Sequence, residues 1–296
     1  MARVNPRLTI DLTHGRTVVT VREAGPEAPV AVVLPAMGVA AGYYTPFAEA
    51  LVAQGISVAV PDYPGHGEST PGVSRRTRYG YRDLADEWLT AVIDAVVADH
   101  PEREVVLVAH SLGGHVALAH LAQHAHPAIR GLVTLGTASP YWRTYTKPLL
   151  LLAQTQTVNV VSRVLGVWPG HRMGFGGRQP RELMSEWARF AWHGRLEPQG
   201  SGAYEAAMGA ISVPALVIDL ANDTLAPPSA VDHFASKLSG ASVQRLHFDK
   251  GPDAPGRPVD HFSFARSPEL IDEIVADFVL ACGQDDLPEA AGAQTS

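Results

Sequence analysis

Short apolar runs alternate with amphipathic segments along most of this 296-residue chain. Strands are predicted where the runs are continuous or alternate in polarity, at 8–12, 17–22, 30–34, 56–60, 105–109, 131–135, 215–220 and 243–248. Helices are predicted at 46–54, 79–98, 112–124, 229–238 and 269–280. Strands that alternate with helices form mostly parallel sheets covered on both faces. We therefore predict an α/β fold with a mostly parallel eight-stranded sheet and helices on both faces.

The alternation is interrupted between residues 138 and 212, which are helical in character and rich in Trp, Leu and Arg. We interpret 138–212 as an inserted helical cap, and residues 1–137 and 213–282 as the α/β core. The glycines within 170–177 predict a flexible segment in the cap, with no helix start. Residues 283–296 carry no apolar period, so we expect a disordered tail.

Composition and charge exclude several classes of protein. The chain has 23 Lys and Arg against 30 Asp and Glu, a net charge of −7, which is opposite to the charge of a nucleic-acid-binding surface. Its single cysteine, Cys282, excludes an intrachain disulfide and a thiolate zinc site. No apolar run is long enough to span a membrane, and residues 1–11 lack a secretory signal pattern. We predict no nucleic-acid partner, no membrane span and a cytoplasmic location, and leave the oligomeric state open.

The segment around Ser111 carries the strongest chemical signal. An apolar strand ends at this serine and a helix begins directly after it, with the small residues Ala109 and Gly113 two positions to either side. Such a sharp turn needs small neighbours and lifts the serine oxygen to the tip of the sheet. It also leaves the Leu112 N–H at a helix N-terminus, where it can stabilise an oxyanion. The alternative is an ordinary helix N-cap serine.

A carboxylate and a histidine follow at later strand ends. Asp223 lies in a polar turn after the run 215–220, and His261 lies in a loop after the run 243–248. A serine hydroxyl needs a base near neutral pH, and the base needs an acid that fixes its tautomer. We expect Ser111 as nucleophile, His261 as base and Asp223 as acid. Asp219, inside the strand, and Asp260, next to His261, remain alternatives for the acid.

These pieces resemble the α/β-hydrolase superfamily over residues 8–281. The matching segments are Ala109-His110-Ser111-Leu112-Gly113-Gly114, the Asp223 turn, the His261 loop, Asp62-Tyr63-Pro64-Gly65-His66-Gly67-Glu68-Ser69, and Leu34-Pro35-Ala36-Met37-Gly38. The resemblance implies a hydrolase with a Ser-Asp-His triad. It also implies that the Met37 N–H is the second donor of the oxyanion hole, beside Leu112.

A narrower resemblance is to a poorly characterised bacterial subgroup of serine hydrolases of the esterase, lipase and aminopeptidase kind. It is carried by residues 35–38, by Tyr44-Thr45-Pro46-Phe47 and by Tyr141-Trp142-Arg143. Two departures stand out: Ala109 replaces the commoner glycine, and Pro35-Ala36 replaces the common His-Gly. The first still satisfies the size rule of the turn, and the second changes the two residues that directly precede Met37.

The predicted cap carries the candidate substrate-binding residues. Trp142, Trp187 and Trp192 could line an acyl pocket or serve as packing. The cap has eight Lys and Arg against four Glu, a charge of +4, which leaves −11 for the remainder. This excess would attract an anionic substrate, or it is simply a solvated helical face. An aminopeptidase would need a free cap carboxylate, for which Glu182, Glu186 and Glu205 are the candidates.

The predicted function is that of a serine hydrolase, which cleaves an ester-type bond of a small acyl substrate through an acyl-enzyme. No cofactor is predicted. In one hypothesis the substrate is anionic. A thioesterase or acyltransferase would use the same triad, and an aminopeptidase or a non-catalytic binding protein on this fold are further alternatives. His120 and His124 have the i, i+4 spacing of zinc ligands, but Leu121 occupies the place of the glutamate in H-E-x-x-H. We therefore predict no metal site.

Overall fold

The computed structural model of this protein describes residues 7–13, 15–98, 102–198, 203–249 and 258–283. The predicted tail after residue 283 lies outside these residues. Eight strands form one sheet, namely β1 (Arg7–Leu12), β2 (Gly15–Arg22), β3 (Val30–Leu34), β4 (Ser57–Pro61), β5 (Val105–His110), β6 (Ile129–Leu135), β9 (Ala215–Leu220) and β10 (Val243–Phe248).

The strand order is β1-β2-β4-β3-β5-β6-β9-β10. β2 pairs antiparallel with both β1 and β4, and every other neighbouring pair is parallel. The prediction of a mostly parallel eight-stranded sheet is confirmed. Because the strands from β4 to β10 run in one direction, the loops after β3, β5, β6, β9 and β10 all emerge at one edge.

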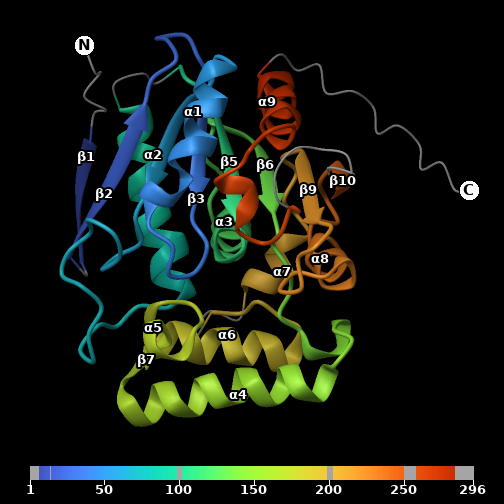
Figure 1. The fold of residues 1–296 in the computed structure, drawn as a ribbon. Helices are drawn as coiled ribbons and strands as arrows, with labels where there is room; N and C mark the ends of the chain where they lie inside the picture. The colour runs from blue at the N-terminus through green and yellow to red at the C-terminus, as the bar shows by residue number, and fades with distance from the viewer. Residues whose placement is uncertain (1–6, 14, 99–101, 199–202, 250–257, 284–296) are drawn as a thin grey trace, which may run out of the picture.

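Helices cover both faces of the sheet (Figure 1). Residues of α1 (Thr45–Ala53) and α9 (Ile271–Cys282) pack on one face, and those of α2 (Leu89–Val97), α3 (Leu112–Gln123) and α8 (Pro228–Ala235) pack on the other. The inner strands are mostly apolar because alternate residues face opposite helical layers: in β3, Val32 and Leu34 face the α3 side, and Ala31 and Val33 the α1 side.

The segment 138–212, called the cap segment below, lies beyond the lower edge of the sheet in Figure 1, at the opposite end from α9. It contains α4 (Pro148–Leu165), α5 (Gly170–Met173), α6 (Arg181–His193) and α7 (Tyr204–Met208), with a hairpin of β7 (Val167–Pro169) and β8 (Arg178–Pro180). The expectation that no helix starts among the glycines was wrong, because α5 begins at Gly170 inside the hairpin.

The predicted helix 79–98 begins later and is less regular than expected. Residues 81–97 are helical, with a π-helical stretch (Asp83–Trp88) leading into α2. The N–H of Tyr81 donates to the carboxylate of Glu186 at 2.7 Å, and the N–H of Gly80 donates to Asp83 at 2.8 Å. Because Glu186 lies on α6, a contact more than 100 residues away in sequence helps to set where this helix begins.

We expect two buried histidines to make the stability sensitive to acid. Burial lowers the pKa of His115 and of His120 to about 4, against about 6.5 in an unfolded chain. The unfolded chain therefore takes up protons first as the pH falls, and acid favours unfolding. The stabilisation is complete above about pH 6.5 and is lost toward pH 4, by about 3 kcal/mol for each histidine.

Urea unfolding at pH 7 and at pH 4.5 would measure this loss. The variant His120→Gln removes one titrating ring, so its free energy of unfolding should fall less between the two pH values than that of the natural protein. The same difference in both proteins would contradict the assignment.

Candidate active site

Ser111 occupies a strained turn between β5 and α3. Its φ is 53°, a left-handed value that is rare for a residue with a side chain. A Cβ at Gly113 would lie 2.4 Å from the Leu34 carbonyl oxygen, and one at Gly114 would lie 2.4 Å from the Thr137 side chain. The two glycines are therefore required for α3 to start this close to the sheet. This is a sharp strand-to-helix turn, with Leu112 as the first helical residue.

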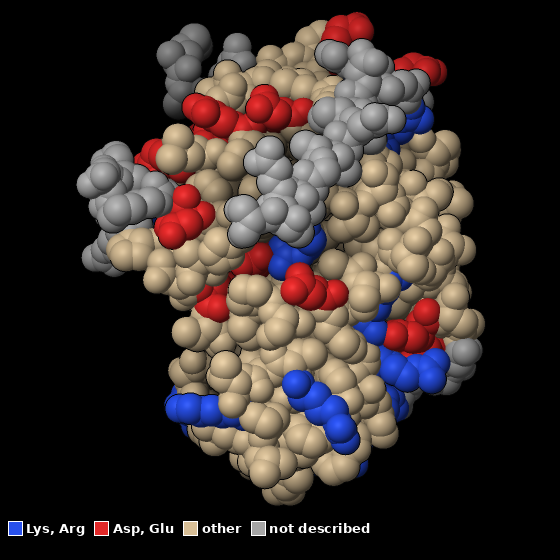
Figure 2. Space-filling model, turned by 90° about the vertical axis from the view of Figure 1, so that its right-hand side faces the viewer, with Lys and Arg blue, Asp and Glu red and all other residues tan. Residues whose placement is uncertain are grey.

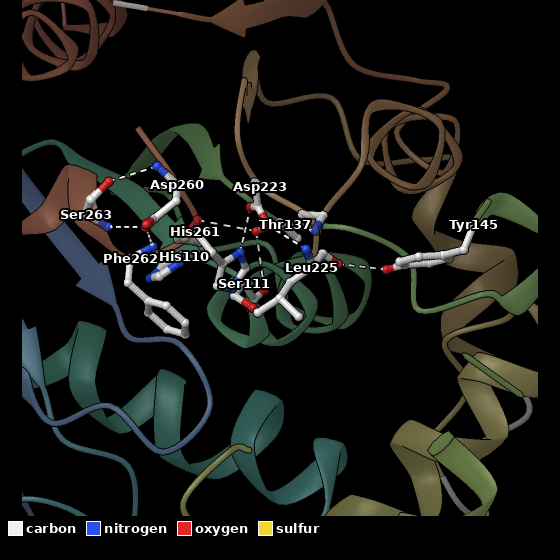
Figure 3. Close-up of polar contacts among 12 residues, drawn as sticks. His110, Ser111, Thr137, Tyr145, Asp223, Leu225, Asp260, His261, Phe262 and Ser263 are labelled. Carbon is white, nitrogen blue, oxygen red and sulfur yellow. Dashed lines mark hydrogen bonds and ion pairs between the residues drawn. The ribbon is translucent and has the colours of Figure 1, made fainter. Parts of the chain in front are cut away.

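His261 and Asp223 form a buried pair beside this turn. Nδ1 of His261 lies 2.6 Å from Oδ2 of Asp223, and the two side chains are 8% and 0% exposed. The other carboxylate oxygen, Oδ1, accepts the N–H groups of Leu225 and Ala226 at 2.8 and 2.9 Å. Figure 3 shows the His261 ring between Asp223 and Ser111. The turn after β9 thus holds the carboxylate in one orientation, aimed at Nδ1.

The two alternative acids have other partners. The carboxylate of Asp219 lies 2.5 Å from Nδ1 of His247 and 2.7 Å from the Arg245 guanidinium, both on β10. Asp260 caps its own loop, where it accepts the N–H groups of Phe262 and Ser263 at 2.9 and 2.8 Å. Neither carboxylate is directed at His261 by these contacts, so the geometry favours Asp223 as its partner.

Gly136, at the end of β6, was not singled out from the sequence. Its φ is 54°, and a Cβ there would lie 2.9 Å from Oδ2 of Asp223 and 3.2 Å from Nδ1 of His261. A side chain at this position would push against the hydrogen bond between them. The only signal in the sequence is a glycine that directly follows a buried strand, which many turns share.

A buried tyrosine links the loop after β3 to the turn of Ser111. The Ala36 N–H donates to Oη of Tyr44 at 2.8 Å, and this Oη lies 2.7 Å from Nδ1 of His110. Tyr44 is fully buried. Burial, and then the charge of nearby His261, hold the pKa of His110 well below its usual value, which keeps the ring neutral. Tyr44 therefore accepts from Ala36 and is also hydrogen-bonded to His110, and this fixes the loop that carries Met37.

We expect Tyr44→Phe to lower kcat by about 10- to 100-fold with little change in KM. If the Met37 N–H is an oxyanion donor, its displacement weakens an interaction that forms in the transition state and not in the ground state. Steady-state kinetics on a soluble ester would measure it. Tyr79→Phe is the matched control, since it removes a buried hydroxyl that donates to Pro64 at 3.0 Å. An equal loss in both variants, or a loss confined to KM, would argue against positioning by Tyr44.

A cavity of about 750 Å³ opens over Ser111, between the core and the cap segment. Ser111, Leu112, Met37 and His261 lie in its wall, and much of the remainder is apolar, including Leu151, Val158, Trp168, Phe175 and Trp187. Of the three tryptophans proposed for substrate binding, only Trp187 is among the described lining residues. The Trp142 indole instead donates to the carbonyl of Trp192 at 3.2 Å, and Trp192 is 50% exposed at the end of α6.

The charged groups of the cap segment lie mostly outside the cavity. Lys147 is the single Lys or Arg among the described lining residues, and no Asp or Glu is among them. Glu186 accepts the N–H of Tyr81, Glu182 pairs with Arg181 at 2.8 Å, and Glu205 pairs with Lys237.

Neither a metal centre nor a membrane span was found in the described part of the chain. No group of three or more His, Cys, Asp or Glu side chains there could hold a metal ion. None of the helices in these ranges is long and apolar enough to cross a membrane.

The loop of Met37 is in backbone contact with the cap segment. A Cβ at Gly38 would lie 2.4 Å from the Gly176 carbonyl oxygen and 2.7 Å from the Gly177 nitrogen. A Cβ at Gly176 would lie 2.8 Å from Sδ of Met37. The glycines of the cap hairpin therefore allow its turn to pack tightly on this loop.

The chain matches one family model and many solved structures. Residues 25–187 match the model of the family described as serine aminopeptidase, S33, a range that includes Ser111 and ends before Asp223. No curated protein sequence matches the chain.

Similar structures include an esterase from Thermogutta terrifontis, at 17% identity and a TM-score of 0.59, covering 94% of this chain and 99% of that one. A thioesterase domain from the curacin biosynthetic pathway has 17% identity and a TM-score of 0.58, covering 94% and 100%. A haloalkane dehalogenase from Bradyrhizobium elkani has 18% identity and a TM-score of 0.59, covering 95% and 99%. At these identities the likenesses show the α/β-hydrolase fold alone.

Proposed function

The chain belongs to the serine aminopeptidase S33 family of α/β-hydrolases, and we propose that it is a serine hydrolase that cleaves carboxylic esters rather than aminoacyl bonds. The observation that carries the proposal is the Asp223–His261 pair, 2.6 Å apart, beside Ser111 in a largely apolar cavity. A carboxylate, an imidazole and a serine hydroxyl in that order form a general-base relay for acyl transfer.

In the proposed reaction, Nε2 of His261 takes the proton of Ser111 as Oγ attacks the ester carbonyl. The N–H groups of Leu112 and Met37 stabilise the oxyanion of the tetrahedral intermediate. The intermediate collapses when His261 returns the proton to the leaving alcohol, and an acyl-enzyme remains on Ser111. A water then gives a proton to His261 as it attacks the acyl carbonyl. The second tetrahedral intermediate collapses when His261 returns this proton to Oγ of Ser111, and the acid leaves. Asp223 stabilises the imidazolium in both steps.

The chemistry of the cavity argues against aminopeptidase activity. A free α-ammonium group in the substrate would need a carboxylate partner, because an unpaired charge in an apolar site is strongly unfavourable. No Asp or Glu is found among the described residues of the cavity wall. The three cap carboxylates that could serve are already engaged with Tyr81, Arg181 and Lys237. An uncharged acyl chain needs no such partner and can pack against the apolar side chains of the cavity wall.

One residue of the cavity wall, Lys147, supports the hypothesis of an anionic substrate. Lys147 reaches the cavity wall, whereas the other seven cations of the cap segment are not among the described lining residues. The cation would pair with a carboxylate at the far end of an acyl chain. Comparing an ester of a dicarboxylic half-acid with a neutral ester of the same length, in the natural protein and in Lys147→Gln, would separate this effect from chain length.

The test is a substrate panel on the purified full chain: p-nitrophenyl esters from acetate to octanoate, the matching thioesters, and aminoacyl p-nitroanilides. We expect kcat/KM for the esters to rise with chain length, by up to about fourfold per methylene buried, since each contributes about 0.8 kcal/mol. The anilides should not be turned over. A fluorophosphonate should label Ser111, as located by peptide mass spectrometry. Faster hydrolysis of the anilides than of the esters would reject the proposal, and so would an absence of labelling.

A further inference from the structure

The outer face of α4 is apolar and exposed. Leu149, Val160 and Val164 are 71%, 58% and 78% exposed. At 3.6 residues per turn, these three side chains and Ala153 fall within about 60° of the helix circumference. These four residues are called the outer stripe below. A surface helix normally turns such a stripe toward the core, but here the opposite face of α4, with Thr155, Val158 and Ser162, is the buried one.

Exposed apolar side chains are concentrated around this helix. Ten large hydrophobic residues are exposed in the described part of the chain, and seven of them belong to the cap segment. Two of the other three, Leu225 and Phe262, lie in the cavity wall. Single exposed apolar residues are normal anywhere on a protein, whereas a contiguous group marks a binding surface.

The Lys and Arg of α4 and of the segments on either side of it in the chain are not accompanied by any Asp or Glu. Between residues 105 and 181 the sequence contains no Asp or Glu. Arg143 and Lys147 precede α4, Arg163 lies in its last turn, and Arg172 lies on α5. All four are exposed, and none forms an ion pair within the described residues. Figure 2 shows Lys and Arg at the end of the molecule formed by the cap segment, while most of the Asp and Glu in that view lie higher, over the core.

The outer stripe adjoins the mouth of the cavity. Ala153 belongs to the stripe and also lines the cavity, together with its neighbours on the helix, Leu150 and Thr157. Met173 of α5, 56% exposed, lines the same opening. An apolar molecule that leaves a surface in contact with the stripe would therefore reach the cavity without crossing water.

We propose that the outer stripe and its four flanking cations bind an anionic lipid surface, with α4 lying in the plane of the interface and the cavity mouth facing the lipid. An exposed apolar helix face with basic residues around it is the pattern of interfacial helices, and each basic residue near an anionic membrane adds to the attraction. A second copy of the chain fits less well, because pairing two stripes about a twofold axis would bring cations together from both copies. The inference concerns binding alone and does not depend on the proposed function.

The test is co-sedimentation of the full chain with vesicles of phosphatidylcholine alone, or of equal parts phosphatidylcholine and phosphatidylglycerol. We expect at least about tenfold tighter binding to the anionic vesicles, weakened by added salt. Val164→Glu should lower that affinity by at least about tenfold, since it replaces the most exposed large side chain of the outer stripe by a carboxylate, which an anionic surface repels. Leu270→Glu is the matched control, because Leu270 is 47% exposed and directly precedes α9, at the other end of the molecule. Both variants should hydrolyse a soluble ester at the natural rate.

Three outcomes would overturn the inference. The first is no binding to anionic vesicles, or equal binding to both kinds. The second is a Val164→Glu protein that binds as tightly as the natural one. The third is a dimer in sedimentation velocity that Val164→Glu dissociates, which would assign the stripe to contact between two copies of the chain.

Discussion

Replacing Ser111 by alanine is expected to lower kcat by about 10⁶, because a triad that acts as a unit loses nearly all of its rate when the nucleophile is removed. Steady-state kinetics with a p-nitrophenyl ester would measure the loss. Alanine has a Cβ like serine, so the energetic cost of the φ of 53° is the same for both residues. The variant should therefore retain the turn. Urea unfolding of the variant should show stability close to that of the natural protein.

Ser139→Ala is the matched control for this experiment. Ser139 is fully buried, follows β6 at the same edge of the sheet, and has an Oγ without a hydrogen-bond partner among the described residues. Its replacement should leave kcat within about twofold, since no hydrogen bond is lost. Turnover by Ser111→Ala within tenfold of the natural rate would rule out a covalent intermediate on this serine.

Replacing Asp223 by asparagine is expected to lower kcat by about 10⁴ while leaving the fold intact. The reason lies in the contacts of the carboxylate. Oδ1 accepts two backbone N–H groups, so the asparagine must keep its oxygen there and turn its NH₂ toward Nδ1 of His261. Nδ1 then becomes the acceptor and the proton moves to Nε2, which can no longer take a proton from Ser111.

Asp219→Asn and Asp260→Asn complete this test. Asp219 pairs with His247 and Arg245, and Asp260 with its own loop, so each variant should keep kcat within about tenfold. The magnitudes are compared by kinetics on the same ester, with circular dichroism as the check on folding. A larger loss in either of these variants than in Asp223→Asn would transfer the role of the acid to that residue.

The sheet and the turn of Ser111 could be predicted from the sequence because their signals are local. A buried strand in a parallel sheet is mostly apolar, and β3 and β9 lie where the apolar runs predicted them. Ala109 and Gly113, two positions to either side of Ser111, indicated a sharp turn, and a Cβ at Gly113 would lie 2.4 Å from the Leu34 carbonyl oxygen.

The features that sequence reasoning missed depend on contacts between distant segments. Tyr44 and His110 are 66 residues apart, and nothing near either residue indicates a hydrogen bond between them. The directions of Trp142 and Trp192 follow from how α6 packs, which periodicity does not determine. Gly136 looks like an ordinary turn glycine until Asp223 and His261 are placed beside it.

The contact of Gly38 with Gly176 and Gly177 has a consequence for protein engineering. Backbone meets backbone there, so neither side can be redesigned by exchanging side chains alone. A chimaera that receives the helices of a relative but keeps residues 35–38 would put the foreign hairpin against the native loop, and any bulk would displace the Met37 N–H. The hairpin and this loop therefore form one transplantable module, and recombination breakpoints belong outside both.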